Sequence, residues 1–246
     1  MEPENLHLFL LVGQSNMAGR GAVEPEDRVA HPRVLTLDRS DHWVPAVDPI
    51  HFDKPFAGVG LGRTFGIAMA ERHPDAVIGL IPRAAGGSFI SSWEPGAYWE
   101  QTNSHPYDDA IRRAKVAMQY GRLKGILWHQ GESEAEPGLA EVYEQKLHAL
   151  IQRFRHDLAA PDVPFIVGQM GRYMTWNDAL QRVNLAHESL PGKVPHTAFV
   201  SSDGLTPMAD QVHFDAASLR EFGRRYAAAY TRLTEQTDRR RRASGR

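Results

Sequence analysis

The segment LHLFLLV at residues 6–12, followed at once by GQSNM at residues 13–17, decides the fold of this chain. The first segment has a single polar residue and is far too short to span a bilayer. It fits a β-strand that is buried on both faces. The glycine and the polar residues after it predict a sharp turn into a helix. We therefore expect Ser15 to lie at the carboxyl end of the first strand.

The same arrangement recurs along the chain, where short apolar runs alternate with segments of helical periodicity. Helices are predicted where apolar side chains recur every three or four residues, at residues 60–72, 108–120, 139–158 and 216–233. Further strands are predicted at residues 33–37, 76–81, 123–129, 165–170 and 197–200. Continuous apolar strands separated by helices indicate a parallel sheet with helices on both faces. The sequence therefore predicts a three-layer α/β/α sandwich with a mainly parallel sheet of five or six strands.

The composition limits the domain organisation and the partners. The chain has 246 residues and a formal net charge of −2, which gives no reason to expect nucleic acid or an anionic membrane as a partner. It has no cysteine, which excludes disulfides, zinc–thiolate sites and a cysteine nucleophile. No internal repeat or Ser/Gly linker divides it. We expect one domain over residues 1–234 and a basic, disordered tail over residues 235–246, where four arginines stand in a row.

The first residues are acidic, and the apolar run after them is too short for a secretory signal with a cleavage site. We therefore expect the chain to remain in the cytoplasm. The sequence leaves the oligomeric state open.

Four polar clusters stand beside the predicted strands and the last helix. They are GQSNM (residues 13–17), AAGGS (84–88), WHQGES (128–133) and DQVHF (210–214). The first three follow strands, and the fourth precedes the last helix. Because ligands of open α/β sheets bind beyond the carboxyl ends of the strands, we expect the clusters to converge at that edge.

Each cluster has a simpler interpretation when it is taken alone. Ser15 or Asp210 can cap a helix, paired glycines form ordinary loops, and Glu132 can be a carboxylate at a helix start. Together, however, they supply a serine hydroxyl, amide donors and a carboxylate–histidine pair, which are the roles that acyl transfer requires. In this interpretation His213 takes the proton of Ser15, and Asp210, three residues earlier, orients the imidazole.

The four clusters resemble those of the SGNH hydrolase superfamily. More narrowly, they are similar to its sialate O-acetylesterase/acetylxylan esterase branch, the SASA domain family (carbohydrate esterase family six), and WVPAVDP at residues 43–49 resembles that family's second block. The resemblance runs from about residue 6 to about residue 230. It implies a flavodoxin-like fold and a serine esterase that removes acetyl groups from a carbohydrate, with no metal or organic cofactor.

The resemblance also implies roles for individual residues. By motif match, Ser15 is the nucleophile, His213 the base and Asp210 its partner acid. Glu132 is a second acid that can also engage the histidine. The oxyanion hole is expected from the Ser15 amide, the Gly87 amide and the Gln130 side chain. Substrate contacts are expected from Gln14, Asn16, Trp93 and His129. Two departures from the family pattern are Ser88, where the branch often has threonine, and Glu134, where aspartate is frequent.

Three other functions compete with this one. The first is the same machinery acting on a lipid, aryl ester or thioester, since Trp93, Tyr98 and Trp99 suit an acyl pocket as well as a sugar ring. The second is a metal hydrolase built from residues of the last two clusters, His129, Glu132, Asp210 and His213, which would leave Ser15 unexplained. The third is a non-catalytic carbohydrate-binding protein, which would need no base. Chelators, serine-directed reagents and esters of different chain length distinguish these possibilities.

Overall fold

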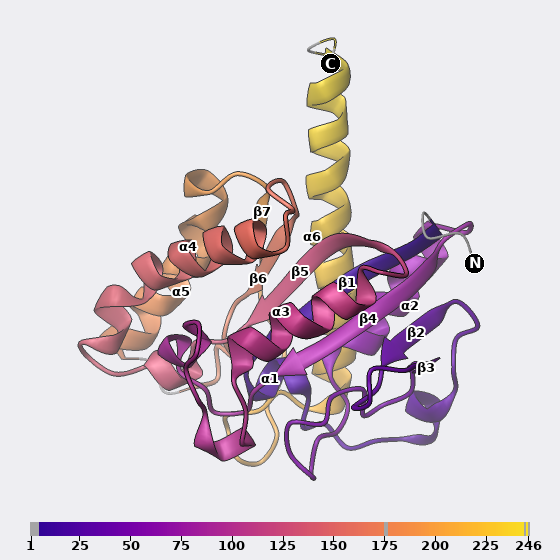
Figure 1. Ribbon diagram of the computed structural model, residues 1–246. Coiled ribbons are helices and arrows are strands. Elements are labelled where there is room, and N and C mark those ends of the chain that lie inside the picture. The colour runs from indigo at the N-terminus through magenta and orange to yellow at the C-terminus, as the bar shows by residue number, and fades with distance from the viewer. Residues whose placement is uncertain (1–4, 175–176, 244, 246) are drawn as a thin grey trace.

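The first strand, β1 (Leu6–Gly13), lies inside a seven-stranded sheet (Figure 1). The computed structural model describes residues 5–174, 177–243 and 245, and within them the strand order is β3-β2-β4-β1-β5-β6-β7. All neighbouring strands are parallel except β2 and β3. The other strands are β2 (Val34–Leu37), β3 (Trp43–Pro45), β4 (Val77–Ala84), β5 (Arg122–His129), β6 (Phe165–Gly168) and β7 (Thr197–Val200).

Helices cover both faces of this sheet (Figure 1). They are α1 (Ser15–Ala18), α2 (Leu61–Arg72), α3 (Pro106–Ala117), α4 (Leu139–Asp157), α5 (Asp178–Lys193) and α6 (Ala216–Ala243). Apolar residues of α2 and α6 belong to the core on one face, and those of α3, α4 and α5 to the core on the other. The predicted three-layer α/β/α sandwich with a mainly parallel sheet is confirmed.

Alternate residues of β1 enter the two cores. Leu8 and Leu10 pack with α3 and α4, whereas Phe9 and Leu11 pack with α2 and α6. Because successive side chains of a strand point to opposite faces, a strand covered on both faces is apolar at nearly every position. Full burial of each such side chain contributes about 1.5–3 kcal/mol. This explains why the opening apolar run fixes the middle of the sheet.

Two elements were not predicted. The short edge strand β3 pairs antiparallel with β2, so the sheet has seven strands instead of the expected five or six. Helix α5 has apolar residues at helical spacing, among them Leu180 and Val183, but Pro191 lies inside its last turn and interrupts the pattern. Its start is fixed locally, because the side-chain oxygen of Asn177 accepts a hydrogen bond from the Leu180 N–H at 2.8 Å.

Strand β4 extends beyond Pro82, which was expected to stop it at Ile81. The N–H of Ile78 donates to the Arg33 carbonyl, on the side of β4 that faces β2. By alternation, the nitrogen of Pro82 faces the same side. Pairing between β2 and β4 ends at Leu80, so the missing N–H of the proline removes no hydrogen bond from the ladder.

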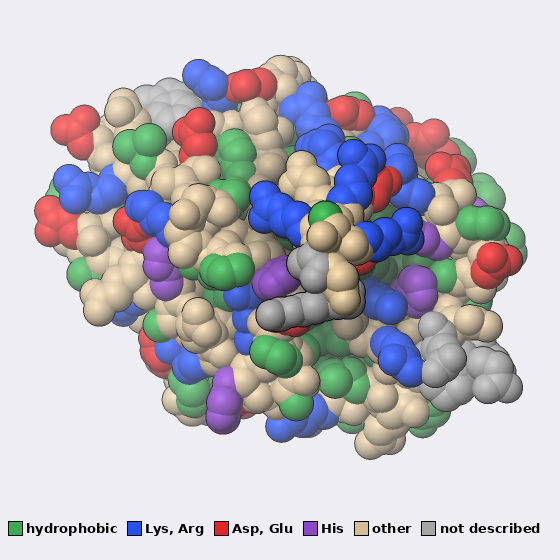
Figure 2. Space-filling model, turned by 90° about the horizontal axis from the view of Figure 1, so that it is seen from above, with side chains coloured by type: hydrophobic (Ala, Val, Ile, Leu, Met, Phe, Trp, Pro, Cys, Tyr) green, Lys and Arg blue, Asp and Glu red, His purple; other side chains and the backbone are tan. Residues whose placement is uncertain are grey.

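Helix α6 also differs from the prediction, since it continues to Ala243 instead of ending near Leu233. The prediction that the tail is disordered is therefore wrong for residues 235–243, which are helical. Residues 234–243 contain neither glycine nor proline, and four of the ten are Arg, which favours helix. The end of α6 projects from the sandwich (Figure 1), and Figure 2 shows Lys and Arg side chains gathered around it. Arg241 pairs there with Asp162 at 3.3 Å. Within the described part of the chain, no helix is both long and apolar enough to cross a membrane.

The strand order reverses at β1, which places three loops side by side. After β1 the chain builds β2, β3 and β4 on one side, then crosses to β5, β6 and β7 on the other. Gly13, the last residue of β1, pairs with Ala84 of β4 and His129 of β5. A Cβ at Gly13 would lie 2.0 Å from the His129 carbonyl oxygen, so only glycine allows this close approach. Such switch points are where open α/β sheets bind ligands.

Candidate active site

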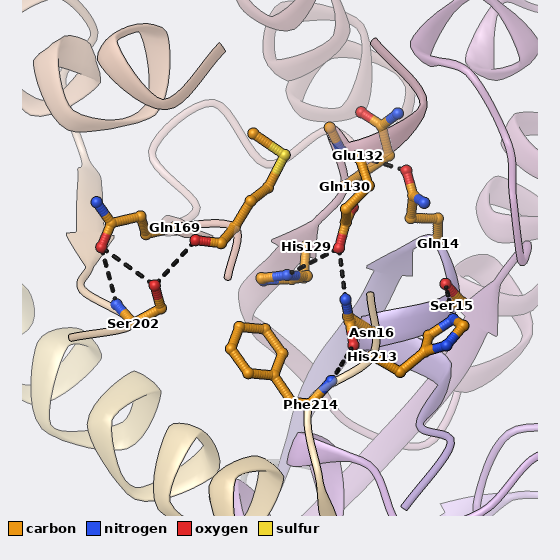
Figure 3. Close-up of polar contacts among 12 residues, drawn as sticks. Gln14, Ser15, Asn16, His129, Gln130, Glu132, Gln169, Ser202, His213 and Phe214 are labelled. Atoms are coloured by element: carbon orange, nitrogen blue, oxygen red, sulfur yellow. Dashed lines mark hydrogen bonds and ion pairs between the residues drawn. The ribbon is translucent and has the colours of Figure 1, made fainter. Parts of the chain in front are cut away.

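Ser15 begins the short helix α1 directly after β1. Its hydroxyl lies 2.9 Å from Nε2 of His213, although the two residues are 198 positions apart in the sequence (Figure 3). The serine side chain is not engaged as a helix cap, because the cap position is occupied by Gln14 without a side-chain hydrogen bond. The structure therefore brings together the serine and histidine that the sequence singled out.

A carboxylate holds the other side of the histidine ring. Asp210 Oδ2 lies 2.6 Å from His213 Nδ1, and Asp210 Oδ1 accepts the backbone N–H groups of Val212 and His213, both at 2.9 Å. Desolvation raises the pKa of Asp210, but the hydrogen bonds from the His213 side chain and from the two amides outweigh it and lower the pKa to about 2. The carboxylate is therefore ionised at neutral pH and fixes the ring with Nε2 toward Ser15.

Two backbone N–H groups beside the serine have no acceptor among the described residues. They belong to Ser15 and to Gly87, whereas the neighbouring amides of Gly86 and Ser88 donate to Asp53 and to the Ala85 carbonyl. Gly87 has φ of +74°, a left-handed conformation that favours glycine. Free N–H groups at a helix start and at a glycine turn are suited to binding an oxyanion.

Gln130, which was expected to complete the oxyanion hole, has its side-chain amide bound elsewhere. Its Nε2 donates to the Ser88 carbonyl at 3.0 Å and to the carboxylate of Glu134. The residue has no exposed surface. Both N–H bonds are therefore used inside the protein, and Gln130 supports the turn at residues 84–88 in place of the expected donation to an oxyanion.

Glu132, expected as a second acid for His213, contacts other groups. Among the described residues its partners are the Asn16 amide, which donates to Oε1 at 2.6 Å, and the His129 ring, whose Nε2 lies 3.5 Å from Oε1. Burial raises the pKa of Glu132, but these two partners outweigh it and leave the pKa below its usual value. Glu132 therefore reaches the histidine loop only indirectly.

The residues expected to contact substrate are mostly buried. Trp93 and His129 have no exposed surface, and the Trp93 indole N–H donates to the Ser88 hydroxyl at 3.0 Å. The side-chain oxygen of Gln14 accepts the Gly131 N–H at 3.3 Å. Asn16 is 1% exposed. These side chains lie beneath the surface of the site. Because Trp93 and His129 have no exposed surface, a sugar bound at Ser15 would not contact them.

Two sets of contacts at the site were not predicted, although Trp99 itself had been named as an aromatic residue of the pocket. Arg20 and Asp53 form a buried ion pair of 2.7 Å. Asp53 also accepts the Gly86 N–H at 3.0 Å, so the pair stabilises the turn after β4. Trp99 donates its indole N–H to the Gly86 carbonyl at 3.0 Å and packs edge-on against Phe89. Nothing in the local sequence of Arg20 or Asp53 signals the pairing, which depends on the fold to bring residues 33 positions apart together.

The residues of the alternative metal site separate into two pairs. Asp210 contacts His213 beside the serine, whereas Glu132 contacts the buried His129. In the parts of the chain that the structure describes, no three His, Asp or Glu side chains are grouped to hold a metal ion.

The fold, a three-layer sandwich around a mainly parallel sheet, is that of the SGNH-type esterases. Residues 5–232 match the family described as "Carbohydrate esterase, sialic acid-specific acetylesterase". The chain belongs to this family of carbohydrate esterases, which are carboxylic ester hydrolases.

Similar proteins agree with the family match. A probable carbohydrate esterase of Arabidopsis thaliana is 32% identical over 247 residues, covering 91% of this chain and 89% of the relative. The crystal structure of this same Arabidopsis protein has a TM-score of 0.82 at 31% identity and covers 93% of this chain and 98% of the other. NanS has the same fold, with a TM-score of 0.73 at 18% identity over 96% and 99%. A carbohydrate acetylesterase from Xanthomonas citri has the same fold at 20% identity, with a TM-score of 0.71 over 93% of this chain and 56% of the other.

Proposed function

We propose that this protein is a serine esterase that hydrolyses O-acetyl groups of a carbohydrate through an acetyl-enzyme intermediate. One observation carries the proposal: a continuous chain of contacts runs from the Ser15 hydroxyl through the His213 ring to the Asp210 carboxylate, with distances of 2.9 and 2.6 Å. A binding module needs a docking surface but no such chain, so the geometry favours catalysis over carbohydrate binding alone.

The first half of the reaction acetylates the serine. His213 Nε2 takes the hydroxyl proton as Ser15 Oγ bonds to the acetyl carbon, and the carbonyl oxygen gains the negative charge of the tetrahedral intermediate. When the intermediate collapses, the bond from the acetyl carbon to the sugar oxygen breaks. The leaving sugar oxygen takes the proton from His213, so the free sugar hydroxyl and acetyl-Ser15 are formed.

The second half repeats these steps with water as the nucleophile. His213 takes a proton from water as the water oxygen attacks acetyl-Ser15, then returns it to Ser15 Oγ as acetate leaves. Throughout, the ionised Asp210 stabilises the charged imidazole ring. No other reactant is required.

The negative oxygen is assigned to the Ser15 and Gly87 amides. Both N–H groups lack an acceptor in the described chain, which leaves them available for this charge. Removing one oxyanion donor typically costs about 10²–10³ in rate. Because Gln130 is occupied by Ser88 and Glu134, a third donor is not assigned to it.

An acetylated carbohydrate is proposed as the substrate, and an acetyl group as the preferred acyl group. The specificity of the matching family and the acetylesterase from Xanthomonas citri support this choice. Trp99 and Phe89, partly exposed beside the Gly86 turn, supply aromatic surface on which a sugar ring can pack.

The test is acetate release from a panel of acetylated saccharides, run beside octanoyl esters and an acylated lipid. We expect release from at least one saccharide, poor turnover of octanoyl esters and insensitivity to chelators. Equal or better turnover of long acyl chains would favour the lipid esterase, and loss of activity with a chelator would favour the metal hydrolase.

A further inference from the structure

Asn16, the residue after the nucleophile, forms hydrogen bonds with the loop that carries His213. Its Nδ2 donates to the Val212 carbonyl at 3.2 Å. Its Oδ1 accepts the Phe214 N–H at 3.0 Å (Figure 3). The two partners are the residues immediately before and after His213. One buried side chain thus ties the backbone on both sides of the base to the turn that presents the nucleophile.

Glu132 holds Asn16 in this orientation. Its Oε1 accepts from Asn16 Nδ2 at 2.6 Å, shorter than the bond from the same nitrogen to Val212. Glu132 is fixed in turn by His129, whose Nδ1 lies 3.3 Å from the Tyr226 hydroxyl. The side chains of Asn16, Glu132 and His129 are at most 4% exposed, so water does not compete for their hydrogen bonds.

The loop needs such a restraint because it is otherwise exposed. Val212 is 38% exposed, and the Asp210 side chain is 46% exposed. Other bonds to the loop come from Met208, whose N–H donates to the His213 carbonyl at 2.7 Å, and from the Tyr173 hydroxyl, which donates to the Val212 carbonyl at 3.2 Å. Apart from the His213–Ser15 contact itself, the described hydrogen bonds between this loop and the turn after β1 are the two made by Asn16.

We infer that Asn16 and Glu132 are positioning residues, which set the distance between His213 Nε2 and the Ser15 hydroxyl without touching the substrate. This inference rests on the proposed serine mechanism. In this inference Glu132 acts on His213 through Asn16 and does not contact the imidazole itself. A displacement of about 1 Å in such a geometry can cost about 10² in rate.

The first test compares Asn16→Ala with Asn184→Ala on the acetylated saccharide that the wild-type protein hydrolyses best. Asn184 is a matched control, since it is also a buried asparagine whose Oδ1 accepts a backbone N–H, that of Met170 at 3.1 Å. We expect Asn16→Ala to lower kcat about 10²-fold with KM little changed, and Asn184→Ala to keep wild-type kcat. Circular dichroism checks that both variants are folded.

The second test asks whether Asn16 acts through the base. In a His213→Ala background, adding Asn16→Ala should lower the residual rate no further, because there is no imidazole left to position. A loss that adds fully to that of His213→Ala would overturn the inference and assign Asn16 a role elsewhere.

A third comparison keeps the inference testable if Asn16→Ala fails to fold. Glu132→Gln retains an oxygen that accepts from Asn16 and should keep kcat within about tenfold of wild type, whereas Glu132→Ala should fall about as far as Asn16→Ala. Equal losses in both Glu132 variants, or wild-type kcat in Asn16→Ala, would overturn the proposal. Ser15→Ala separates the two proposals: an active Ser15→Ala enzyme overturns the serine mechanism itself, whereas an inactive one beside a fully active Asn16→Ala overturns only the positioning role.

Discussion

The contact between His213 and Asp210 assigns the acid of the proposed triad. Asp210 touches the ring at 2.6 Å, and the partners of Glu132 in the described chain are Asn16 and His129. Two carboxylates that shared one imidazole would buffer each other's loss, but here only one of them contacts it. The two acids should therefore respond differently to substitution.

We predict that Asp210→Ala lowers kcat by roughly 10⁴, since the acid of a serine triad orients the imidazole and stabilises its charge. Glu132→Ala should lose roughly 10², because it loosens only the Asn16 contact. Steady-state kinetics on an acetylated saccharide, with folding checked for each variant, measures both losses. A Glu132→Ala enzyme that is dead beside a nearly normal Asp210→Ala enzyme would reverse the assignment.

The triad was more predictable from the sequence than the rest of the site. Three residues separate Asp210 from His213, so the chain itself keeps the pair close, and Ser15 follows an unmistakable strand. The environment of Gln130 and Glu132 was not predictable in the same way. Whether an amide faces an oxyanion or a protein carbonyl depends on partners from other strand ends, which a local pattern does not specify.

The turn after β4 supplies the Gly87 N–H that is proposed to bind the oxyanion. The direction of this N–H depends on the backbone conformation of the turn. Gly87 has φ of +74°, and a Cβ there would lie 2.7 Å from the Gln101 side-chain oxygen. Gly138, at the start of α4, has φ of +84°, and a Cβ there would meet no described atom within 4 Å. The two glycines share a positive φ and differ in their place relative to Ser15.

We predict that Gly87→Ala lowers kcat by about 10², because the strained turn must shift and carry its N–H away from the oxyanion. Gly138→Ala should lower the unfolding free energy by about 1–3 kcal/mol, the usual cost of a sparsely populated backbone conformation, with no change in kcat. Kinetics and urea unfolding of the two variants give the comparison. An equal kcat in both would remove Gly87 from the oxyanion hole.

The elements that were not predicted, or that differ in extent, have physical reasons in common. Strand β3 is three residues long, and α5 contains a proline, so each lacks the long uninterrupted pattern that marks an element. Strand β4 passes Pro82 because its neighbour has already ended. Helix α6 extends through residues whose helix preference is good although they bury little. The end of β4 therefore depends on its neighbouring strand, and the end of α6 on the intrinsic helix preference of its residues.

Beneath the site lies a buried carboxyl group whose ionisation affects the stability of the whole molecule. Glu134 is 1% exposed, and burial raises its pKa from 4.5 to about 7 against the lowering effect of the Ile90 N–H and the Gln130 amide. Between pH 4.5 and 7 the folded protein keeps a proton on Glu134 that the unfolded chain has released. This group therefore destabilises the fold progressively as the pH rises through that window, and the full cost is present above it.

We predict that Glu134→Gln removes this pH dependence, because glutamine resembles the protonated acid in shape and does not ionise. The unfolding free energy of the variant minus that of the wild type should be roughly 1–3 kcal/mol larger at pH 8 than at pH 5. Urea unfolding at the two pH values cancels contributions from other titrating groups, since these are common to both proteins. A difference that stays constant with pH would contradict the raised pKa.

The topology of the sheet brings the serine, the glycine turn and residues 128–133 to one edge, as expected, but the strand order that does so was not predicted. Alternating strands and helices predicted three layers, but the order β3-β2-β4-β1-β5-β6-β7 arises from pairing between segments far apart in the chain. The reversal of that order at β1 explains why residues of three different loops meet at Ser15.

The most direct test of the proposed mechanism is covalent labelling of the native protein with an organophosphonate. A serine whose proton is taken by His213 should react with it, and intact mass followed by peptide mapping should find one adduct on Ser15, formed in step with the loss of acetate release. The label should be absent in Ser15→Ala and slow in His213→Ala. An adduct on another residue, or an unlabelled protein that still releases acetate, would contradict the assignment of Ser15 as the nucleophile.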